Sequence, residues 1–248
     1  MAKDLFSEQA DLYAQYRPTY PEDLFIYILS FVTDKGVAWD CATGNGQAAL
    51  RLAHYVERVE ATDISEAQLR NAIQKDNIHY QLSAAETTPF ADNSFDLITV
   101  ATAYHWLDWK AFYKEATRVG KPGCVVAAWA TYTMLLPGPA LQELYREFYW
   151  NVVGPYWDPE RIYVDEQYRT VAFDFEPLPL QPFQIELNWT KQQFKGYLET
   201  WSSSQKYTKA NDVSPLTVID IQLNELWGND EVKKVIIPLC LRLGRVTK

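Results

Sequence analysis

Two acids and a glycine turn are the residues of this chain whose types and spacing are best suited to chemistry. The segment 37–47 (VAWDCATGNGQ) is apolar up to Asp40 and then continues into two glycines. A second apolar segment, 59–63 (VEATD), ends in Asp63. A strand, a glycine turn and a helix, followed one strand later by an acid, form the pattern with which a doubly wound sheet binds a nucleoside cofactor. We therefore expect a nucleoside site, with Asp63 suitably placed for a ribose.

The same turn is compatible with two cofactors. Gly44-x-Gly46-x-x-Ala49 fits the dinucleotide fingerprint, which would make the protein an NAD-dependent oxidoreductase. In a dinucleotide site, however, the helix N-terminus faces an anionic pyrophosphate, and the carboxylate of Asp40 would oppose that charge. S-adenosylmethionine carries an ammonium and a sulfonium but no phosphate, so it tolerates an acid there. The electrostatics favour S-adenosylmethionine, and NAD remains the alternative.

His105 is the candidate catalytic residue. It follows the apolar segment 95–101, at the edge where open α/β sheets bind ligands. Three roles are open to it: general base, donor that orients an acceptor, or packing beneath the cofactor. A contact role for His105 or Trp106 in the pocket is favoured, because a substrate group that is already ionised, such as a carboxylate, needs no base. A phenol or amine substrate would favour His105 as the base.

Aromatic residues and one arginine are candidates for the walls of a pocket. Arg17 and Tyr16 lie ahead of the first strand, where they would close over the cofactor, or where Arg17 would pair with a substrate carboxylate. The alternative is an arginine stacked on a structural turn. Trp129, Tyr132 and Trp201 are further candidates, although aromatic residues at helical spacing more often belong to a core.

The elements that must position these residues alternate between strand-like and helix-like through residue 130. This alternation predicts a parallel sheet covered by helices. After residue 130 the chain is rich in Trp, Tyr, Phe and Pro, and an amphipathic segment at 5–13 precedes the sheet. We expect strands at 37–42, 58–62, 79–82, 95–101, 124–130, 183–188 and 235–243. We expect helices at 5–13, 47–55, 66–75, 108–119, 140–152, 190–202 and 215–227, with a polar loop at 202–212.

These elements predict an α/β fold. The expected architecture is a doubly wound, mostly parallel, seven-stranded Rossmann-like sheet with helices on both faces and an N-terminal helical lid. We expect one domain over residues 1–248. Its parts would be an N-terminal helical cap at 1–35, a cofactor-binding core at 36–130, a substrate-side insertion with helices at 131–227 and a last strand at 228–248.

Composition narrows the class of protein. With 248 residues, of which 48% are hydrophobic, the chain can bury a large core. A net charge of −9 without a Lys/Arg run argues against a nucleic-acid partner. No apolar run approaches the roughly 20 residues of a membrane span, and the first residues lack the apolar region of a signal peptide. Three cysteines without paired spacing predict neither a disulfide framework nor a metal site. We expect a soluble cytoplasmic protein, a monomer or homodimer, with a small-molecule substrate and no membrane partner.

Four ordered motifs resemble those of the class I S-adenosylmethionine-dependent methyltransferases of the type 11 family. They are Asp40-x-Ala42-x-Gly44-x-Gly46 and the segments 84–90, 92–96 and 118–123. Ala42 replaces the first glycine of the family signature, and because alanine disfavours positive φ we expect an alanine-compatible turn there. The resemblance implies S-adenosylmethionine as the cofactor, with Asp63 on both ribose hydroxyls. The implied cofactor-binding residues are Asp40, Ala42, Gly44, Gly46, Asp63, Ile64, Ala85, Glu86 and Ala101.

Further motifs are similar to those of the branch that contains trans-aconitate methyltransferase. They include Phe6 and Tyr13, followed by YRPTYP at 16–21, AYHW at 103–106 and YLETWS at 197–202. This resemblance implies in-line methyl transfer to a small molecule, carboxylates included. Ala42 keeps a second alternative open, a non-catalytic methyltransferase-like binding protein. The expected substrate pocket consists of Tyr16, Arg17, Tyr20, His105, Trp106, Tyr132 and Trp201.

Overall fold

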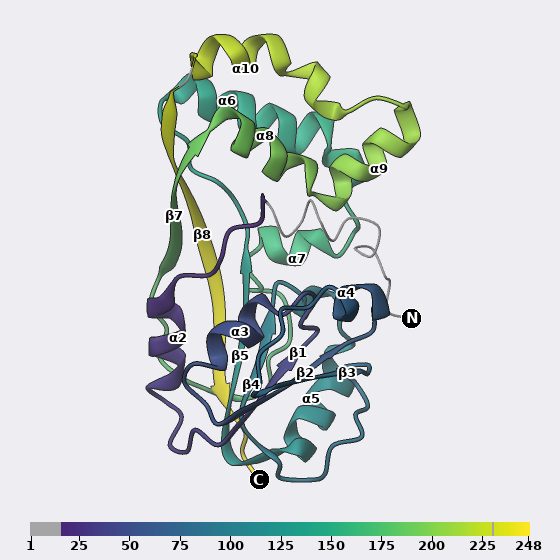
Figure 1. Ribbon diagram of the computed structural model, residues 1–248, viewed down its shortest axis with the longest axis vertical. Coiled ribbons are helices and arrows are strands. Elements are labelled where there is room, and N and C mark those ends of the chain that lie inside the picture. The colour runs from purple at the N-terminus through teal and green to yellow at the C-terminus, as the bar shows by residue number, and fades with distance from the viewer. Residues whose placement is uncertain (1–15, 230) are drawn as a thin grey trace.

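The computed structural model describes residues 16–229 and 231–248 (Figure 1). The helix expected at 5–13, with Phe6 and Tyr13, lies outside the described residues, so the N-terminal lid stays a prediction. The strands are β1 (Val37–Cys41), β2 (Arg58–Asp63), β3 (Ile78–Leu82), β4 (Phe95–Ala101), β5 (Gly120–Thr131), β6 (Glu176–Pro177), β7 (Phe183–Thr190) and β8 (Val232–Arg245). The α-helices are α2 (Glu22–Leu29), α3 (Gln47–Leu52), α4 (Glu66–Arg70), α5 (Trp109–Val119), α6 (Pro139–Glu147), α7 (Arg161–Asp165), α8 (Lys191–Glu199), α9 (Ser202–Asn211) and α10 (Asp220–Trp227). Short 3-10 or π turns are η2 (Tyr104–Trp106), η3 (Phe148–Val152), η4 (Gly154–Tyr156) and η5 (Pro215–Val218).

The sheet is mixed, with a parallel centre. Its strand order is β3-β2-β1-β4-β5-β8-β6, and β7 pairs with β8 off this path as an eighth strand. The first five strands are parallel, whereas β8 runs antiparallel to β5, β6 and β7. Strand order reverses between β1 and β4, where Asp40 pairs with Thr99. Such a reversal is where doubly wound sheets bind ligands.

Helices cover both faces of the central strands. Successive side chains of a strand point to opposite faces, so each strand contributes to two cores. Ala38 and Leu97 pack in one core with α2 and α3, whereas Trp39 and Ile98 pack in the other with α5. This two-sided burial explains why the central strands are apolar throughout.

A long ribbon of β7 and β8 carries a second group of helices (Figure 1). β8 pairs with β5 from Arg245 to Leu239 and with β7 from Leu239 to Val232, so its first half extends beyond β5. Helices α6, α8, α9 and α10 gather at this end of the ribbon, far from α5, and we call them the helical lobe. The prediction of a polar loop at 202–212 was wrong, because α9 occupies most of this segment. Its polar sequence carries no apolar stripe, and only Ser203 and Ser204 are buried within it.

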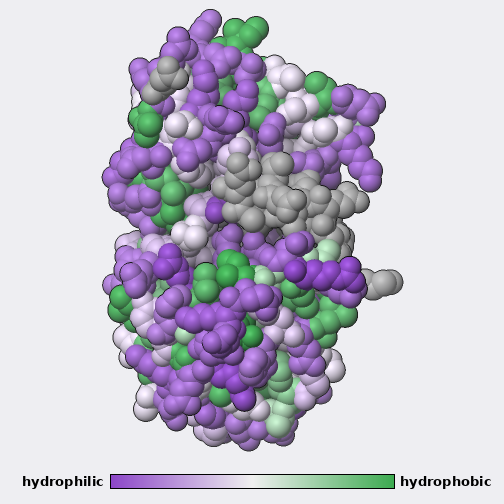
Figure 2. All heavy atoms as spheres, viewed as in Figure 1, coloured by the Kyte–Doolittle hydropathy of each residue, from purple (hydrophilic) through white to green (hydrophobic). Residues whose placement is uncertain are grey.

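The outer surface is mainly hydrophilic on the face shown in Figure 2, with hydrophobic side chains in separate patches. This distribution agrees with the net charge of −9. Among residues 16–229 and 231–248, no helix has both the length and the apolar character needed to cross a membrane.

Candidate active site

A cavity of about 200 Å³ lies at the carboxyl ends of the central strands and extends towards the helical lobe. Around the glycine turn it is lined by the predicted residues Ala42, Gly44, Asp63, Ile64, Ala85, Glu86 and Ala101. Towards the helical lobe it is lined by the predicted residues Arg17, Tyr20, His105, Trp106, Tyr132 and Trp201. Tyr16, Asp40 and Gly46 do not line it. Parallel strands end at one edge of a sheet, and this is why residues distant in sequence meet here.

The turn after β1 is built from left-handed residues. Ala42, Gly44 and Gly46 have φ values of 54°, 58° and 84°. The expectation of an alanine-compatible conformation at Ala42 was wrong. The neighbouring Thr43 is held on both sides, by its N–H to the Thr62 carbonyl at 2.9 Å and by its hydroxyl to Asp40 at 2.5 Å. These bonds offset the steric cost of a Cβ in the left-handed region.

Gly46 begins α3 and approaches the side chain of Tyr80. A Cβ at Gly46 would collide with the Tyr80 hydroxyl, which donates a hydrogen bond to the Ile73 carbonyl at 2.7 Å. Its glycine identity is therefore required by close packing as well as by its positive φ. Tyr16 likewise packs against a glycine, Gly196 of α8, rather than lining the cavity.

Asp63 ties the turn to the end of β2. One carboxylate oxygen accepts a hydrogen bond from the Gly44 N–H, and the other accepts one from the Ser65 N–H, both at 2.8 Å. The same side chain lines the cavity, where a carboxylate is a suitable acceptor for hydroxyl groups of a ligand.

Asp40 lies behind the turn and is fully buried. Its two carboxylate oxygens accept hydrogen bonds from Thr99 at 2.7 Å and from Thr43 at 2.5 Å. Burial raises the pKa of Asp40 to about 6, although both hydroxyl groups act in the opposite direction. Asp40 thus supports the turn from beneath. Its side chain does not line the cavity, but its charge lies close enough to favour a cationic ligand there.

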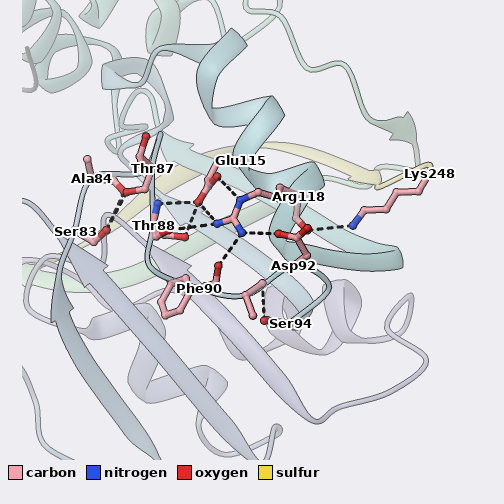
Figure 3. Close-up of polar contacts among 11 residues, drawn as sticks. Ser83, Ala84, Thr87, Thr88, Phe90, Asp92, Ser94, Glu115, Arg118 and Lys248 are labelled. Atoms are coloured by element: carbon pink, nitrogen blue, oxygen red, sulfur yellow. Dashed lines mark hydrogen bonds and ion pairs between the residues drawn. The ribbon is translucent and has the colours of Figure 1, made fainter.

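A charged cluster holds the loop that follows β3 (Figure 3). The buried carboxylate of Glu115 accepts hydrogen bonds from the Thr88 backbone at 2.7 Å, the Thr88 hydroxyl at 2.6 Å and Arg118 at 2.7 Å. Burial by itself would raise the pKa of Glu115, but the hydrogen bonds from Arg118 and Thr88 outweigh it and lower the pKa. Arg118 also bonds Asp92 at 2.7 Å and the Phe90 carbonyl at 2.8 Å. The cluster therefore anchors the segment whose first part lines the cavity.

Glu86 is oriented by the N-terminus of α5. Its carboxylate accepts a hydrogen bond from the Asp108 N–H at 3.1 Å, and Asp108 in turn caps α5 through the Ala111 N–H at 3.0 Å. Glu86 is consequently held at the cavity wall instead of being a freely solvated loop acid.

Five aromatic side chains form the far wall of the cavity, and we call them the aromatic group: Tyr145, Tyr149, Trp157, Tyr197 and Trp201. Their rings meet at centroid distances such as 5.5 Å for Trp157–Trp201 and 5.6 Å for Tyr149–Trp201.

Two arginines stack on this aromatic group. Arg161 lies 4.9 Å over the Trp157 ring, and Arg17 lies 5.3 Å over the Tyr197 ring. Arg17 was expected at the pocket, whereas Arg161 was not, because it begins α7 in a stretch where no helix or strand was expected. No periodicity or motif distinguishes that stretch, and only the packing of α7 against η2 brings Arg161 to the cavity.

His105 is buried at the cavity wall. Its Nδ1 atom lies 3.0 Å from the hydroxyl of Tyr168. Burial, reinforced by the charge of Arg161, lowers the pKa of His105 to about 3. The imidazole is therefore neutral across the physiological pH range, and it is a poor proton acceptor.

The strand order and the acid at the end of β2 define a nucleoside-binding protein of the doubly wound α/β class. A family model described as a methyltransferase domain matches residues 39–128. A provisionally named methyltransferase of Dictyostelium discoideum is 33% identical over 98% of this chain and 95% of its own length. A solved structure from Anaeromyxobacter dehalogenans, provisionally described as a type II methyltransferase, is 35% identical, with a TM-score of 0.86 over 94% of this chain and 99% of that chain. The YcgJ protein of Bacillus subtilis, 19% identical with a TM-score of 0.53 over 91% of this chain and 98% of its own, shares the fold.

The chain therefore belongs to the methyltransferase family, and it is an S-adenosylmethionine-dependent methyltransferase. This membership decides between the two cofactors that the glycine turn allowed, in favour of S-adenosylmethionine.

Proposed function

We propose that the protein methylates a small-molecule acceptor, which binds between the glycine turn and the aromatic group. The supporting observation is that one cavity joins Asp63 and Gly44 to Trp201 and Arg161. Aromatic rings with arginine suit a planar or anionic small molecule. The net charge of −9 does not suit a nucleic acid.

The residues of the cavity fit the cofactor. Asp63 and Glu86 line the part near the glycine turn, whereas the arginines stack on the aromatic group. A cationic donor without phosphate matches an acidic environment, and a pyrophosphate would not. We assign Asp63 to the ribose hydroxyls, Gly44 and its neighbours to the methionine portion, and Ile64, Ala85 and Glu86 to the adenine side.

Bound S-adenosylmethionine supplies a methyl group that its sulfonium already activates. The chain's own residues then have to bind and orient the cofactor and the acceptor and to exclude water. Positioning at near-attack distance accounts for most of the acceleration. Tyr20 is fixed for this purpose, because its hydroxyl and that of Thr102 lie 2.8 Å apart at the cavity wall. A carboxylate acceptor needs no base, which agrees with the low pKa of His105.

A methyl-transfer assay tests this proposal. Purified protein would be given S-adenosylmethionine with a labelled methyl group and a panel of carboxylic acids, phenols and amines, while calorimetry measures cofactor binding. We expect binding and transfer to at least one small molecule. Transfer only to RNA or protein would contradict the proposal. Binding without any transfer would instead support the non-catalytic alternative.

We also place the protein in the cytoplasm. All three cysteines, Cys41, Cys124 and Cys240, are buried free thiols, which suits a reducing compartment.

A further inference from the structure

The hydroxyl of Tyr168 determines which nitrogen of His105 carries the proton. Tyr168 is fully buried, and burial raises its pKa well above the ordinary value, so the phenol keeps its hydrogen. A buried O–H group that donates to nothing is costly. Among residues 16–229 and 231–248 the hydroxyl of Tyr168 has one partner, the ring Nδ1 atom of His105 at 3.0 Å, so Nδ1 accepts the phenolic hydrogen. The single proton of the neutral imidazole then resides on Nε2.

The Nε2 atom of His105 is open to the cavity. His105 lines the cavity, and within residues 16–229 and 231–248 its one polar partner is the Tyr168 hydroxyl on Nδ1. Nε2 is also not among the buried polar atoms of this part of the chain that lack a hydrogen bond. It therefore presents an N–H donor to whatever occupies the cavity.

Arg161 presents a second donor. Its Nε atom donates to Tyr149 at 2.8 Å and to Asp165 at 3.3 Å, and its Nη2 atom donates to the Tyr132 carbonyl at 3.1 Å. These bonds and the stacking on Trp157 fix the plane of the guanidinium. In the described part of the chain Nη1 has no protein partner, and it is not enclosed. Fixed guanidinium donors of this kind suit carboxylates.

The geometry points to a two-donor site, His105 Nε2–H and Arg161 Nη1–H, that binds an anionic carboxylate oxygen of the methyl acceptor, with Tyr168 as the residue that positions His105. This inference rests on the proposed function and assigns its acceptor class to particular residues. Asp165 balances much of the charge of Arg161, so the site recognises the anion by directed hydrogen bonds more than by net charge. The titratable groups that act on His105 and Tyr168 are Arg161, Cys240 and Tyr20.

The reaction at this site balances without a base. One carboxylate oxygen accepts the two hydrogen bonds, and the lone pair of the other attacks the methyl carbon. An O–CH₃ bond forms as the S–CH₃ bond breaks, and the electron pair of that bond stays on sulfur. A carboxylate and a sulfonium thus become a neutral ester and a neutral thioether, and no proton moves. His105 as a fixed donor is compatible with this reaction, whereas His105 as a base is not required.

Three variants separate a donor from a base. His105→Gln keeps an N–H group near the position of Nε2, His105→Met has similar length without a donor, and Tyr168→Phe removes only the positioning hydroxyl. Each would be assayed with trans-aconitate and cinnamate as probes, cinnamamide, p-cresol and benzylamine as uncharged or cationic comparisons, and labelled S-adenosylmethionine. Calorimetric binding of S-adenosylmethionine to every variant verifies the fold and the cofactor site independently of the acceptor.

We expect methylation of a carboxylate probe and none of cinnamamide, p-cresol or benzylamine. His105→Met should raise the acceptor KM by roughly 10- to 100-fold, the effect of losing a hydrogen bond to a charged group, while cofactor binding is retained. The acceptor KM of His105→Gln should stay within about fivefold of the wild-type value. The acceptor KM of Tyr168→Phe should lie between those of His105→Gln and His105→Met. For the wild type, kcat should show no titration between about pH 6 and pH 9.

Two results would overturn the inference. One is equal loss of kcat in His105→Gln and His105→Met together with a wild-type titration near neutral pH, which would make His105 a base. The other is a preference for p-cresol or benzylamine over the carboxylates. A wild-type protein that fails to bind S-adenosylmethionine would instead refute the proposed function itself, so the two failures are distinguishable.

Discussion

The carboxylate of Asp63 at the end of β2 accepts a hydrogen bond from the backbone N–H of Gly44, at 2.8 Å, in the turn that follows β1. The same side chain lines the cavity and accepts a second bond from the Ser65 N–H. One residue thus connects the stability of the turn to the cavity, where we propose that it binds the ribose of the cofactor.

Asp63→Ala should weaken S-adenosylmethionine binding by about 100-fold, because two charge-assisted hydrogen bonds to the ribose would be lost. It should also lower the free energy of unfolding by about 1–2 kcal/mol through the loss of the Gly44 and Ser65 bonds. Calorimetry and urea unfolding measure the two effects. Asp76→Ala, an exposed acid ahead of β3, is the matched control and should change neither. Unchanged affinity in Asp63→Ala would refute the ribose role.

Ala42→Gly should stabilise the protein, although glycine normally destabilises. The residue has a φ of 54°, where a Cβ costs about 1–2 kcal/mol in the folded protein. This cost exceeds the free energy lost because glycine makes the unfolded chain more flexible. We expect a gain of about 0.5–1 kcal/mol in the free energy of unfolding. Ala67→Gly, inside α4, should instead lose about 0.5–1 kcal/mol. A loss in both variants would contradict the strain assigned to Ala42.

Asp40→Asn should change how stability depends on pH. The folded-state pKa of Asp40, about 6, lies above the unfolded value of roughly 3.9, so the folded protein binds the proton more tightly. The stability that this proton contributes is present below pH 4 and is lost as pH rises through 6. At pH 8 the buried charge of Asp40 should lower the free energy of unfolding by about 3 kcal/mol. Asp40→Asn removes this charge and should restore part of that free energy.

Urea unfolding of wild type and Asp40→Asn at several pH values measures this difference. The free energy of unfolding of the variant, relative to that of the wild type, should be highest at pH 8 and lowest near pH 4. A difference that stays constant from pH 4 to pH 8 would show that Asp40 does not titrate as its burial requires. Cofactor affinity of the wild type should also fall below pH 6, because a protonated Asp40 no longer favours a cationic ligand.

Glu115→Gln should destabilise the protein and loosen the loop after β3. The buried carboxylate accepts bonds from Thr88 and Arg118, and removing its charge leaves those donors poorly matched. Because Arg118 is partly exposed and keeps Asp92 as a partner, we expect a loss of about 2 kcal/mol, less than for a fully buried pair. Urea unfolding would measure it, and calorimetry should show weaker cofactor binding.

Glu66→Gln is the control for this variant. Glu66 pairs with Arg70 one turn later on α4, and both side chains are exposed. Such a pair contributes about 0.3–0.5 kcal/mol, so the control should unfold almost like the wild type. Equal losses in Glu66→Gln and Glu115→Gln would show that the buried cluster does not anchor the loop.

The cofactor half of the site was predictable because its signals are local. The apolar run before Asp40, the glycines after it and the acid at Asp63 each mark the end of a strand. Once those strands are parallel, their carboxyl ends must share one edge, so the residues meet without further information. What local signals did not reveal was backbone conformation, and this is why Ala42 was expected in the wrong region.

The position of Asp40 shows a second limit of local reasoning. Its charge correctly favoured a cationic donor, but its side chain lies beneath the turn, bonded to Thr43 and Thr99, and not in the cavity. Sequence spacing places a residue at a strand end, whereas the direction of its side chain depends on which face of the sheet each neighbour fills.

By itself the sequence determined an α/β sheet, a nucleoside site and the sign of the charge that site prefers, since these follow from periodicity, glycine and the order of the acids. Only the tertiary structure brought together the residues that we propose for the acceptor half. Arg161 and Trp157 come from a stretch in which no helix or strand was expected, and Tyr149 lies just past the end of α6. All three join His105 in one cavity through packing between segments that are distant in sequence. Contacts between segments so distant in sequence depend on packing, which no local pattern of residues encodes.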